Sequence, residues 1–373
     1  MHSIISLISI VEKVDDPRIN RTKKHNIVDI LMISICAAMC GMTGWEEIQT
    51  FGEAWIKWFK KFLILPNGIP SHDTFRRVFE RIDPKQLEQV LIDWSNTLNE
   101  CLEGKVIAID GKTLRSSCDK SKGISALHTI SAWVAEDKLV LGQCKVKDKE
   151  NEIIKIPELL NLLEIKKAIV TIDAIGCQKN IAKIIVEEKK ADYILGLKKN
   201  QLTLYNETAA LFRLADSKNI PVDTWRYTEK GHGRIETRHC TCIEAEPWLG
   251  HVAEGWTKLK TVVRIVSTRE IKGKVTESTR YFISSLPRDA KAISQVARAH
   301  WSIENTLHWS LDVVLKEDSI RIRKDNSPEN LAIIRRIAFS LAKARTPEKM
   351  TTKRAQLNAC LKPEFADKHF LKL

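Results

Sequence analysis

The hydrophobic pattern of the first hundred residues predicts helices separated by glycine and proline. Apolar side chains recur there at steps of three and four residues, which is the spacing of a helix that buries one face. The predicted helical segments are residues 26–42, 45–62, 71–82 and 84–99. Ser71 is a typical N-cap for the third segment, and Arg76, Arg77 and Arg81 lie on or near its polar side. This helix is therefore either a DNA recognition helix or a core helix with a solvated face.

After residue 105 the pattern changes to short apolar runs of the kind that form strands. The predicted strands are residues 106–110, 127–134, 139–146, 168–173 and 192–197, and the predicted helices are IPELLNLL and residues 178–190. The order strand, hairpin, helix, strand, helix, strand indicates a mixed sheet with helices packed on it. The fold class expected from this order is α/β (α+β).

The rest of the chain predicts an insertion followed by helices. Residues 200–287 are less regular and include two strand-like runs, so we expect a β-rich insertion there. A long helix is predicted from Asp289 to about Leu315, and a further helix is predicted with Ser327 as its N-cap and Pro328 at its first position. The predicted domains are thus a helical unit over residues 1–100, a sheet-containing unit over 101–345 with an insertion at about 200–287, and a basic C-terminal tail over 346–373.

The charge balance indicates a polyanionic partner. The chain has 60 Lys and Arg against 47 Asp and Glu, a net charge of +13, and its first hundred residues carry 12 basic and 13 acidic residues, so the excess lies later. The longest apolar run, residues 30–42, is roughly a third shorter than the ~20 residues that span a bilayer, and the first residues lack the basic start of a secretory signal. We therefore expect a cytoplasmic protein, associated with the nucleoid when bound to DNA, with no membrane partner. Its nine cysteines lack zinc-site spacing and are expected to be free thiols.

Three acidic residues are candidates for a metal-dependent site. Asp110 and Asp173 each end an apolar strand, and two such strands about 4.8 Å apart would let both carboxylates share metal ions. Glu304 falls in the mainly apolar stripe of the helix after Asp289, where a carboxylate costs several kcal/mol unless it is paired or binds a metal. Mg²⁺ or Mn²⁺ on the aspartates would supply the cation, and a buried ion pair with Arg or Lys is the alternative.

Six segments form an ordered set of motifs along the chain. They are VIAIDGKTLRSS, TIDAIGCQKNIA, DYILGLKKNQ, EKGHGRIETR, HWSIENTLHWSLDVVLKED and RIRKDNSPENLAIIRR. Together, from about residue 10 to about residue 345, they resemble the H-repeat-associated (ISAs-type) insertion-sequence transposases of bacteria. The resemblance implies an RNase H-like DDE core, with Asp110, Asp173 and Glu304 as the triad, behind a transposase-associated helical domain. It also implies two Mg²⁺ (or Mn²⁺) ions, cleavage and strand transfer of double-stranded DNA at element ends, and a dimer on DNA.

The helix that carries Glu304 departs from the pattern of several related insertion-sequence groups. Those groups have a Tyr, an Arg and a Lys at fixed offsets from the glutamate, and the corresponding positions here hold Ala297, His300 and Leu311. A hairpin intermediate or flipped-base handling borrowed from those groups is therefore in doubt. Trp301 and Trp309 either stack on an unpaired base or pack against the protein, and packing is the expected role.

Basic and polar residues near the motifs are the predicted DNA contacts, through phosphate groups. They are Lys112, Arg115, Lys198, Lys199, Asn200, His232, Arg234, Arg238, Arg298, His300, Arg321, Arg323 and Lys324. Gly231 and Gly233 form either a phosphate cradle or a hairpin turn, and the turn is the preferred interpretation. The predicted function is a transposase of a bacterial insertion sequence. A DNA-binding remnant without turnover and a nuclease without strand joining are the alternatives.

Overall fold

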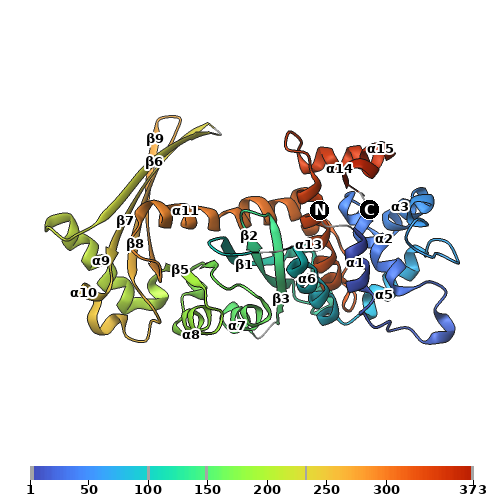
Figure 1. Cartoon of the computed structure of the whole chain (residues 1–373), viewed down its shortest axis with the longest axis horizontal. Coiled ribbons are helices and arrows are strands. Elements are labelled where there is room, and N and C mark those ends of the chain that lie inside the picture. The colour runs from blue at the N-terminus through green and yellow to red at the C-terminus, as the bar shows by residue number, and fades with distance from the viewer. Residues whose placement is uncertain (1–3, 99–100, 148–149, 232, 371–373) are drawn as a thin grey trace.

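The computed structural model describes residues 4–98, 101–147, 150–231 and 233–370, so the predicted DNA contact His232 lies outside the described residues. The N-terminal part is helical, as predicted. Its helices are α1 (Ile4–Val11), α2 (Ile27–Met39), α3 (Trp45–Ala54), α4 (Ile56–Phe59), α5 (His72–Arg81) and α6 (Pro84–Leu98) (Figure 1). The predicted helical segment 26–42, which contains the longest apolar run, forms α2, a helix that is buried along its whole length and capped by the Asn26 side chain. Nowhere in the described ranges does a helix have the length and apolar character that crossing a membrane requires.

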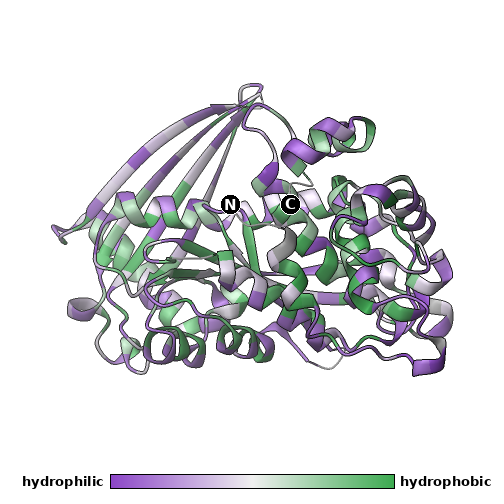
Figure 2. Ribbon diagram, turned by 45° about the vertical axis from the view of Figure 1, so that its right-hand side comes forward, coloured by the Kyte–Doolittle hydropathy of each residue, from purple (hydrophilic) through white to green (hydrophobic). Residues whose placement is uncertain are grey.

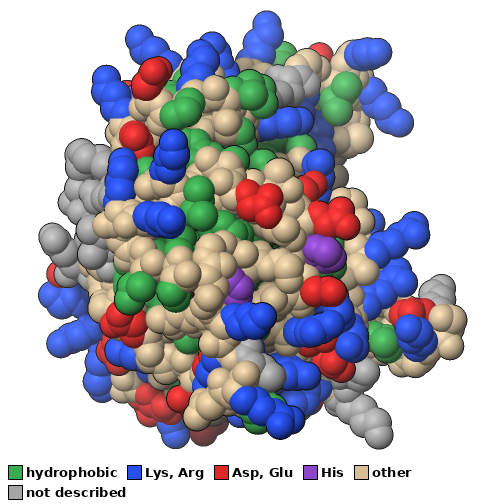
Figure 3. Space-filling model, turned by 90° about the vertical axis from the view of Figure 1, so that its right-hand side faces the viewer, with side chains coloured by type: hydrophobic (Ala, Val, Ile, Leu, Met, Phe, Trp, Pro, Cys, Tyr) green, Lys and Arg blue, Asp and Glu red, His purple; other side chains and the backbone are tan. Residues whose placement is uncertain are grey.

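Helix α5 packs as a core helix. Ser71 caps it as predicted, because its hydroxyl accepts a hydrogen bond from the backbone N–H of Thr74. The guanidinium of Arg76 is held by Asp73 at 2.9 Å and by Glu80 at 2.7 Å. Figure 3 views the molecule from this helical end, where Lys and Arg side chains are scattered among acidic and hydrophobic ones. These contacts favour the core alternative over a recognition helix.

The predicted mixed sheet is present. Its first five strands are β1 (Val106–Leu114), β2 (Leu127–Val134), β3 (Leu139–Val146), β4 (Ile169–Ile172) and β5 (Asp192–Leu197). Their spatial order is β3-β2-β1-β4-β5, with β1, β2 and β3 antiparallel and β1, β4 and β5 parallel. Helices α7 (Glu152–Leu162) and α8 (Lys179–Lys183) lie between the parallel strands in the chain. This is the RNase H-like arrangement.

The insertion extends this sheet. It contains α9 (Leu202–Ser217), β6 (Asp223–Gly231), β7 (Arg234–Glu244), α10 (Glu246–Leu249), β8 (Thr261–Ile271) and β9 (Lys274–Ser284). Because β9 pairs with β5, the four insertion strands continue the core sheet in the order β5-β9-β8-β7-β6. Their outer halves project from the body and are mainly hydrophilic, while their inner halves are apolar (Figure 2). Gly231 pairs with Arg234, which confirms the hairpin turn.

The helix after the insertion runs as predicted, with one irregularity. It consists of α11 (Ala290–His300), a π-helical turn at Ile303–His308 and α12 (Trp309–Val313). It lies on one side of the sheet, and α7 and α8 lie on the other (Figure 1). The predicted N-cap of α13 (Ser327–Arg345) is wrong by one residue. Ser327 is buried inside the helix, and the cap position is Asn326, whose amide instead donates to the Ile82 carbonyl at 3.0 Å.

The basic segment after residue 345 is helical in its described part. It forms α14 (Thr352–Leu361), α15 (Pro363–Phe365) and a π turn at Ala366–Phe370. The Cys360 thiol donates to the carbonyl of Cys40 at 3.2 Å, so this segment lies against the C-terminal end of α2. The nine cysteines are all free thiols, as predicted.

Candidate active site

The first two candidate acids lie where the parallel pairing of the sheet stops. Strands β1 and β4 pair up to Ile109 opposite Ile172, so Asp110 and Asp173 are the next residues along each strand. The expectation that Asp110 ends its strand is wrong, because β1 continues beyond it along β2, with Asp110 opposite Ser131. The reason is that β2 is longer than β4. The two aspartates still leave the parallel pair at the same edge.

Glu304 comes to this edge from the helix after the insertion. It lies in the π-helical turn Ile303–His308. A π turn inserts one extra residue into a helix, is rare, and is frequent at functional sites. The sequence pattern predicts the helix but contains no signal for this turn.

Asp110 and Glu304 both have raised pKa values, and the charge of Asp173 contributes to each rise. Burial raises the pKa of Asp110 to about 7, and the negative charges of Glu304, Asp173 and Glu152 add to the rise, while a backbone N–H opposes it. Burial also raises the pKa of Glu304, where the Arg280 guanidinium opposes the shift and Asp173 adds to it. The acids therefore form one electrostatic cluster. In the described ranges, however, no three His, Cys, Asp or Glu side chains already form a metal-binding group.

Two histidines lie next to this cluster. His308 Nδ1 is 3.7 Å from Asp110 Oδ2, but burial and nearby cations lower the pKa of His308 to about 3. The ring is therefore neutral near pH 7, and the contact is not an ion pair. His308 Nε2 is buried without a hydrogen-bond partner among the described residues. His300, a predicted DNA contact, is instead hydrogen-bonded to Thr171 of β4 at 3.0 Å, and burial lowers its pKa.

A buried arginine supports the strand next to Asp110. Arg336 of α13 is fully buried and pairs with Glu317 at 2.9 Å. It also donates to the hydroxyls of Thr129 and Ser131 on β2, and Ser131 lies opposite Asp110. Sequence reasoning missed this residue. The available signal was a charge within the otherwise apolar face of its helix.

Lys112 links β1 to the helix that follows Glu304. Its side chain is only 6% exposed, and its ammonium lies 2.6 Å from Asp312 Oδ1 and 3.7 Å from Asp318 Oδ1. The ion pair joins the strand of Asp110 to α12. The predicted phosphate contact thus has a structural partner within the chain.

The predicted DNA contacts outside the insertion fall into two groups. Arg115, Lys198, Lys199 and Arg321 have exposed side chains. Asn200, Arg323 and Lys324 are bound to protein atoms, namely the Ala174 carbonyl at 2.7 Å, the Ser116 carbonyl at 2.9 Å and Glu80 at 3.0 Å.

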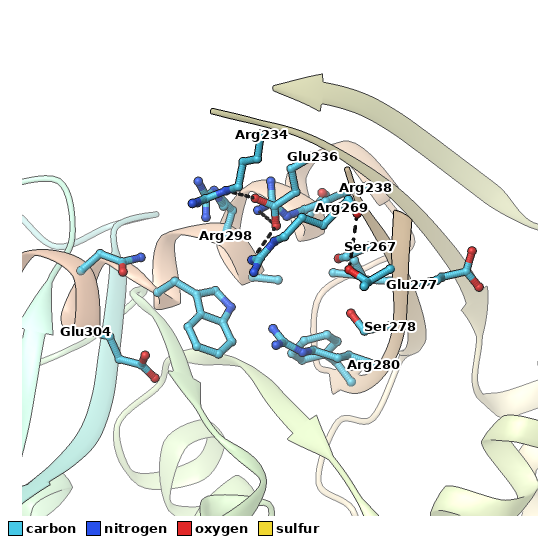
Figure 4. A pocket seen from close by; sticks show the side chains of 17 residues that line it. Arg234, Glu236, Arg238, Ser267, Arg269, Glu277, Ser278, Arg280, Arg298 and Glu304 are labelled. Atoms are coloured by element: carbon cyan, nitrogen blue, oxygen red, sulfur yellow. Dashed lines mark hydrogen bonds and ion pairs between the residues drawn. The ribbon is translucent and has the colours of Figure 1, made fainter. Parts of the chain in front are cut away.

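The predicted contacts in the insertion and on α11 line one hollow. Arg234, Arg238 and Arg298 surround a space of about 460 Å³ that extends to Glu304 (Figure 4). Arg269 and Arg280 line it too and were missed, although the alternation of polar residues along β8 and β9 was a usable signal.

The two tryptophans of this helix differ in their surroundings. Trp301 packs under Arg280, whose guanidinium lies 4.6 Å from the ring centre. Trp309 is 56% exposed, so the expectation that it packs is wrong. The π turn between them shifts the phase of the helix by one residue and turns Trp309 outward.

Comparison with known proteins places this geometry in a family. Residues 102–341 match the transposase DDE domain, and residues 8–95 match the DDE_Tnp_1-associated domain. The chain is 41% identical over 365 residues to the putative transposase YncI of Escherichia coli O157:H7, covering 96% of this chain and 93% of that protein. It is 40% identical over 340 residues to the H repeat-associated putative transposase YhhI of E. coli K12, covering 90% of this chain and 89% of that protein.

A solved structure also matches along the length of the chain. It is the piggyBac transposase synaptic complex with hairpin DNA, at 12% identity and a TM-score of 0.45, covering 99% of this chain and 82% of that one. That likeness is too weak to carry an argument. The domain matches and the two E. coli relatives are sufficient: this chain belongs to the DDE transposase family, among its H-repeat-associated members.

Proposed function

We propose that this chain cuts and rejoins double-stranded DNA at the ends of a mobile element, with Asp110, Asp173 and Glu304 as its catalytic carboxylates. The observation that supports the proposal is the convergence of these acids: Asp110 and Asp173 leave the parallel strands at one edge, and the charges of Glu304 and Asp173 act on Asp110. A buried carboxyl group is normally paired with a cation. The group 3.7 Å from Asp110 is instead the neutral His308 imidazole, and burial and like charges raise the pKa of Asp110 to about 7.

The donor set fits a pair of divalent cations. Carboxylate oxygens are the ligands that Mg²⁺ and Mn²⁺ prefer, and positive charge would relieve the repulsion among the acids. Asp110, Asp173 and Glu304 would hold the ions after side-chain adjustment, since the described residues contain no ready-made metal-binding group. Two bound ions would activate a water or a DNA 3′-hydroxyl and stabilise the leaving oxygen.

The protein's own residues would fix the geometry of this reaction. The register of β1 and β4 places the two aspartates at one edge, and the Lys112–Asp312 ion pair anchors α12 to β1. The His308 ring next to Asp110 is neutral, so it does not balance the negative charge of the Asp110 carboxylate. The exposed side chains of Arg115, Lys198, Lys199 and Arg321 remain predicted phosphate contacts.

The test uses the full chain and DNA from the flanks of its own gene. Duplexes of about 60 base pairs from each flank are incubated with MgCl₂ or MnCl₂, and nicking and strand joining are followed on gels. The wild type should cut and join, while Asp110→Asn, Asp173→Asn and Glu304→Gln should each lose at least 10³-fold in rate and still bind DNA. Glu187→Gln, which changes an exposed carboxylate of the π-helical segment Ile184–Glu188, is the matched control and should cut normally.

Three results would contradict the proposal. Normal cutting by two of the three variants would remove the assigned triad. Cutting without joining would indicate a nuclease. Tight binding without any nicking in either metal would indicate a DNA-binding remnant.

A further inference from the structure

The insertion and α11 enclose a hollow with an unusual concentration of guanidinium groups, which we call the arginine hollow. Its charged lining consists of Arg234, Glu236, Arg238, Arg269, Glu277, Arg280, Arg298 and Glu304. Strands β7, β8 and β9 of the insertion contribute alternate residues, so the side chains of Arg234, Glu236, Arg238, Arg269 and Arg280 share one face of the sheet, whereas Glu277 has the opposite parity. Helix α11 forms the opposite wall, and Figure 4 shows Glu304 across the hollow from the arginine group.

Two glutamates organise the arginines without neutralising them. Glu236 is 7% exposed and lies 2.6 Å from Arg238, 3.5 Å from Arg234 and 3.6 Å from Arg269. Glu229 lies 3.1 Å from both Arg238 and Arg298. Each carboxylate has about four acceptor sites, whereas each of the five guanidinium groups carries five donors. Most of the N–H groups therefore remain available, and they are held in a fixed array before any ligand arrives.

Arg280 stands nearest to the acidic cluster. Its guanidinium is held over the Trp301 ring at 4.6 Å, a contact that orients a cation without using its hydrogen-bond donors. The positive charge of Arg280 acts on Glu304 and opposes the rise in the pKa of that carboxyl group. Among the described residues it has no ion pair within 4.0 Å. Its donors thus face the space between the array and Glu304.

The array has the length of a polymer site. In the β8–β9 ladder Arg269 lies opposite Thr276, and Thr276 and Arg280 are four residues apart on β9. At about 3.3 Å per residue this separation is about 13 Å along the sheet. A DNA strand advances about 3.4 Å along its axis per nucleotide, so the array matches about four nucleotides.

We infer that the arginine hollow binds the phosphate backbone of the DNA and leads the strand to Glu304. Arginine is suited to this task because its planar fork binds phosphate oxygens in pairs. The inference rests on the proposed function for the identity of the substrate, but the binding itself requires no metal. Binding and cutting are therefore separable.

The test measures binding in the absence of divalent metal. A fluorescein-labelled 30-base-pair duplex of arbitrary sequence is titrated with the full chain in EDTA at 50, 100 and 200 mM KCl. The double variant Arg269→Ala/Arg280→Ala should bind at least tenfold more weakly at 100 mM KCl. Its plot of log affinity against log salt should be shallower by about two, since each lost phosphate contact removes about 0.9. Circular dichroism checks that the variant remains folded.

The control arginine lies on the same sheet outside the hollow. Arg226 of β6 is exposed, and Arg226→Ala should leave affinity and slope within twofold and 0.3 of the wild type. If the double variant matches the wild type in both affinity and slope, the hollow is not a DNA site, whatever the cutting assay shows. If the double variant binds more weakly as expected while the wild type never cuts DNA, the inference that the hollow binds DNA is supported and the catalytic proposal fails.

Discussion

Replacing Asp110 by Asn should stabilise the metal-free protein above neutral pH. The Asp110 side chain is 21% exposed, and burial followed by the charges of Glu304 and Asp173 raises its pKa to about 7. In the unfolded chain the same group titrates at 3.8. Between these values the native state binds more protons than the unfolded state, so this group's contribution to stability falls as pH rises.

The size of the effect follows from the shift. Each pKa unit corresponds to about 1.4 kcal/mol, so the raised pKa of Asp110 costs the fold about 1.5 kcal/mol at pH 5, where the folded state keeps it protonated, and about 4 kcal/mol at pH 8. Asn has a similar shape and no charge. The stability advantage of Asp110→Asn should therefore grow by about 2–3 kcal/mol between pH 5 and pH 8 and level off above it.

The assay is urea unfolding in EDTA at pH 5, 6, 7 and 8. Asp15→Asn is the control, because Asp15 is exposed and lies far along the chain from the site, and its difference from the wild type should not change with pH. If the proposed ions bind, MgCl₂ at one hundred times its dissociation constant should stabilise the wild type by about 2.7 kcal/mol and Asp110→Asn much less. A stability difference that is flat from pH 5 to pH 8 would refute the electrostatic cluster.

Two further variants test the supports of the site by urea unfolding. Gly176→Ala should lower the free energy of unfolding by about 1–3 kcal/mol, because a Cβ at this position, in the turn after Asp173, would collide with the buried Ile172 side chain. Gly231→Ala is the control and should change the free energy of unfolding little, because the space around Gly231 is open. Arg336→Met should cost about 3–5 kcal/mol by leaving Glu317 buried and unpaired, and Arg336→Met/Glu317→Leu should recover most of it. Equal losses in the single and double Arg336 variants would show that the ion pair is not the source of the effect.

The sequence predicts the core sheet and the order of its elements because periodicity reports local burial. The hairpin of β2 and β3, the Ser71 cap and the helix after the insertion follow from residues close together in the chain. The merging of the insertion with the core sheet does not, because the pairing of Leu197 with Tyr281 joins distant segments that carry no complementary pattern. The same limit hid the π turn around Glu304, since one extra residue in a helix leaves almost no trace in its hydrophobic spacing.

Several buried charges of this fold have a partner within the chain. Arg336 pairs with Glu317, Lys112 with Asp312, and Glu236 with three arginines. Asp110 has no such partner in His308, the side chain beside it, because burial and nearby cations keep that histidine neutral. A lysine at position 308 would neutralise Asp110 and remove the strain of the acidic cluster. Burial alone does not single out Asp110, because burial also raises the pKa of Asp29, and that of Glu88 to about 8. What distinguishes Asp110 is that it leaves the parallel strand pair beside Asp173 and that the charges of Glu304 and Asp173 both act on it.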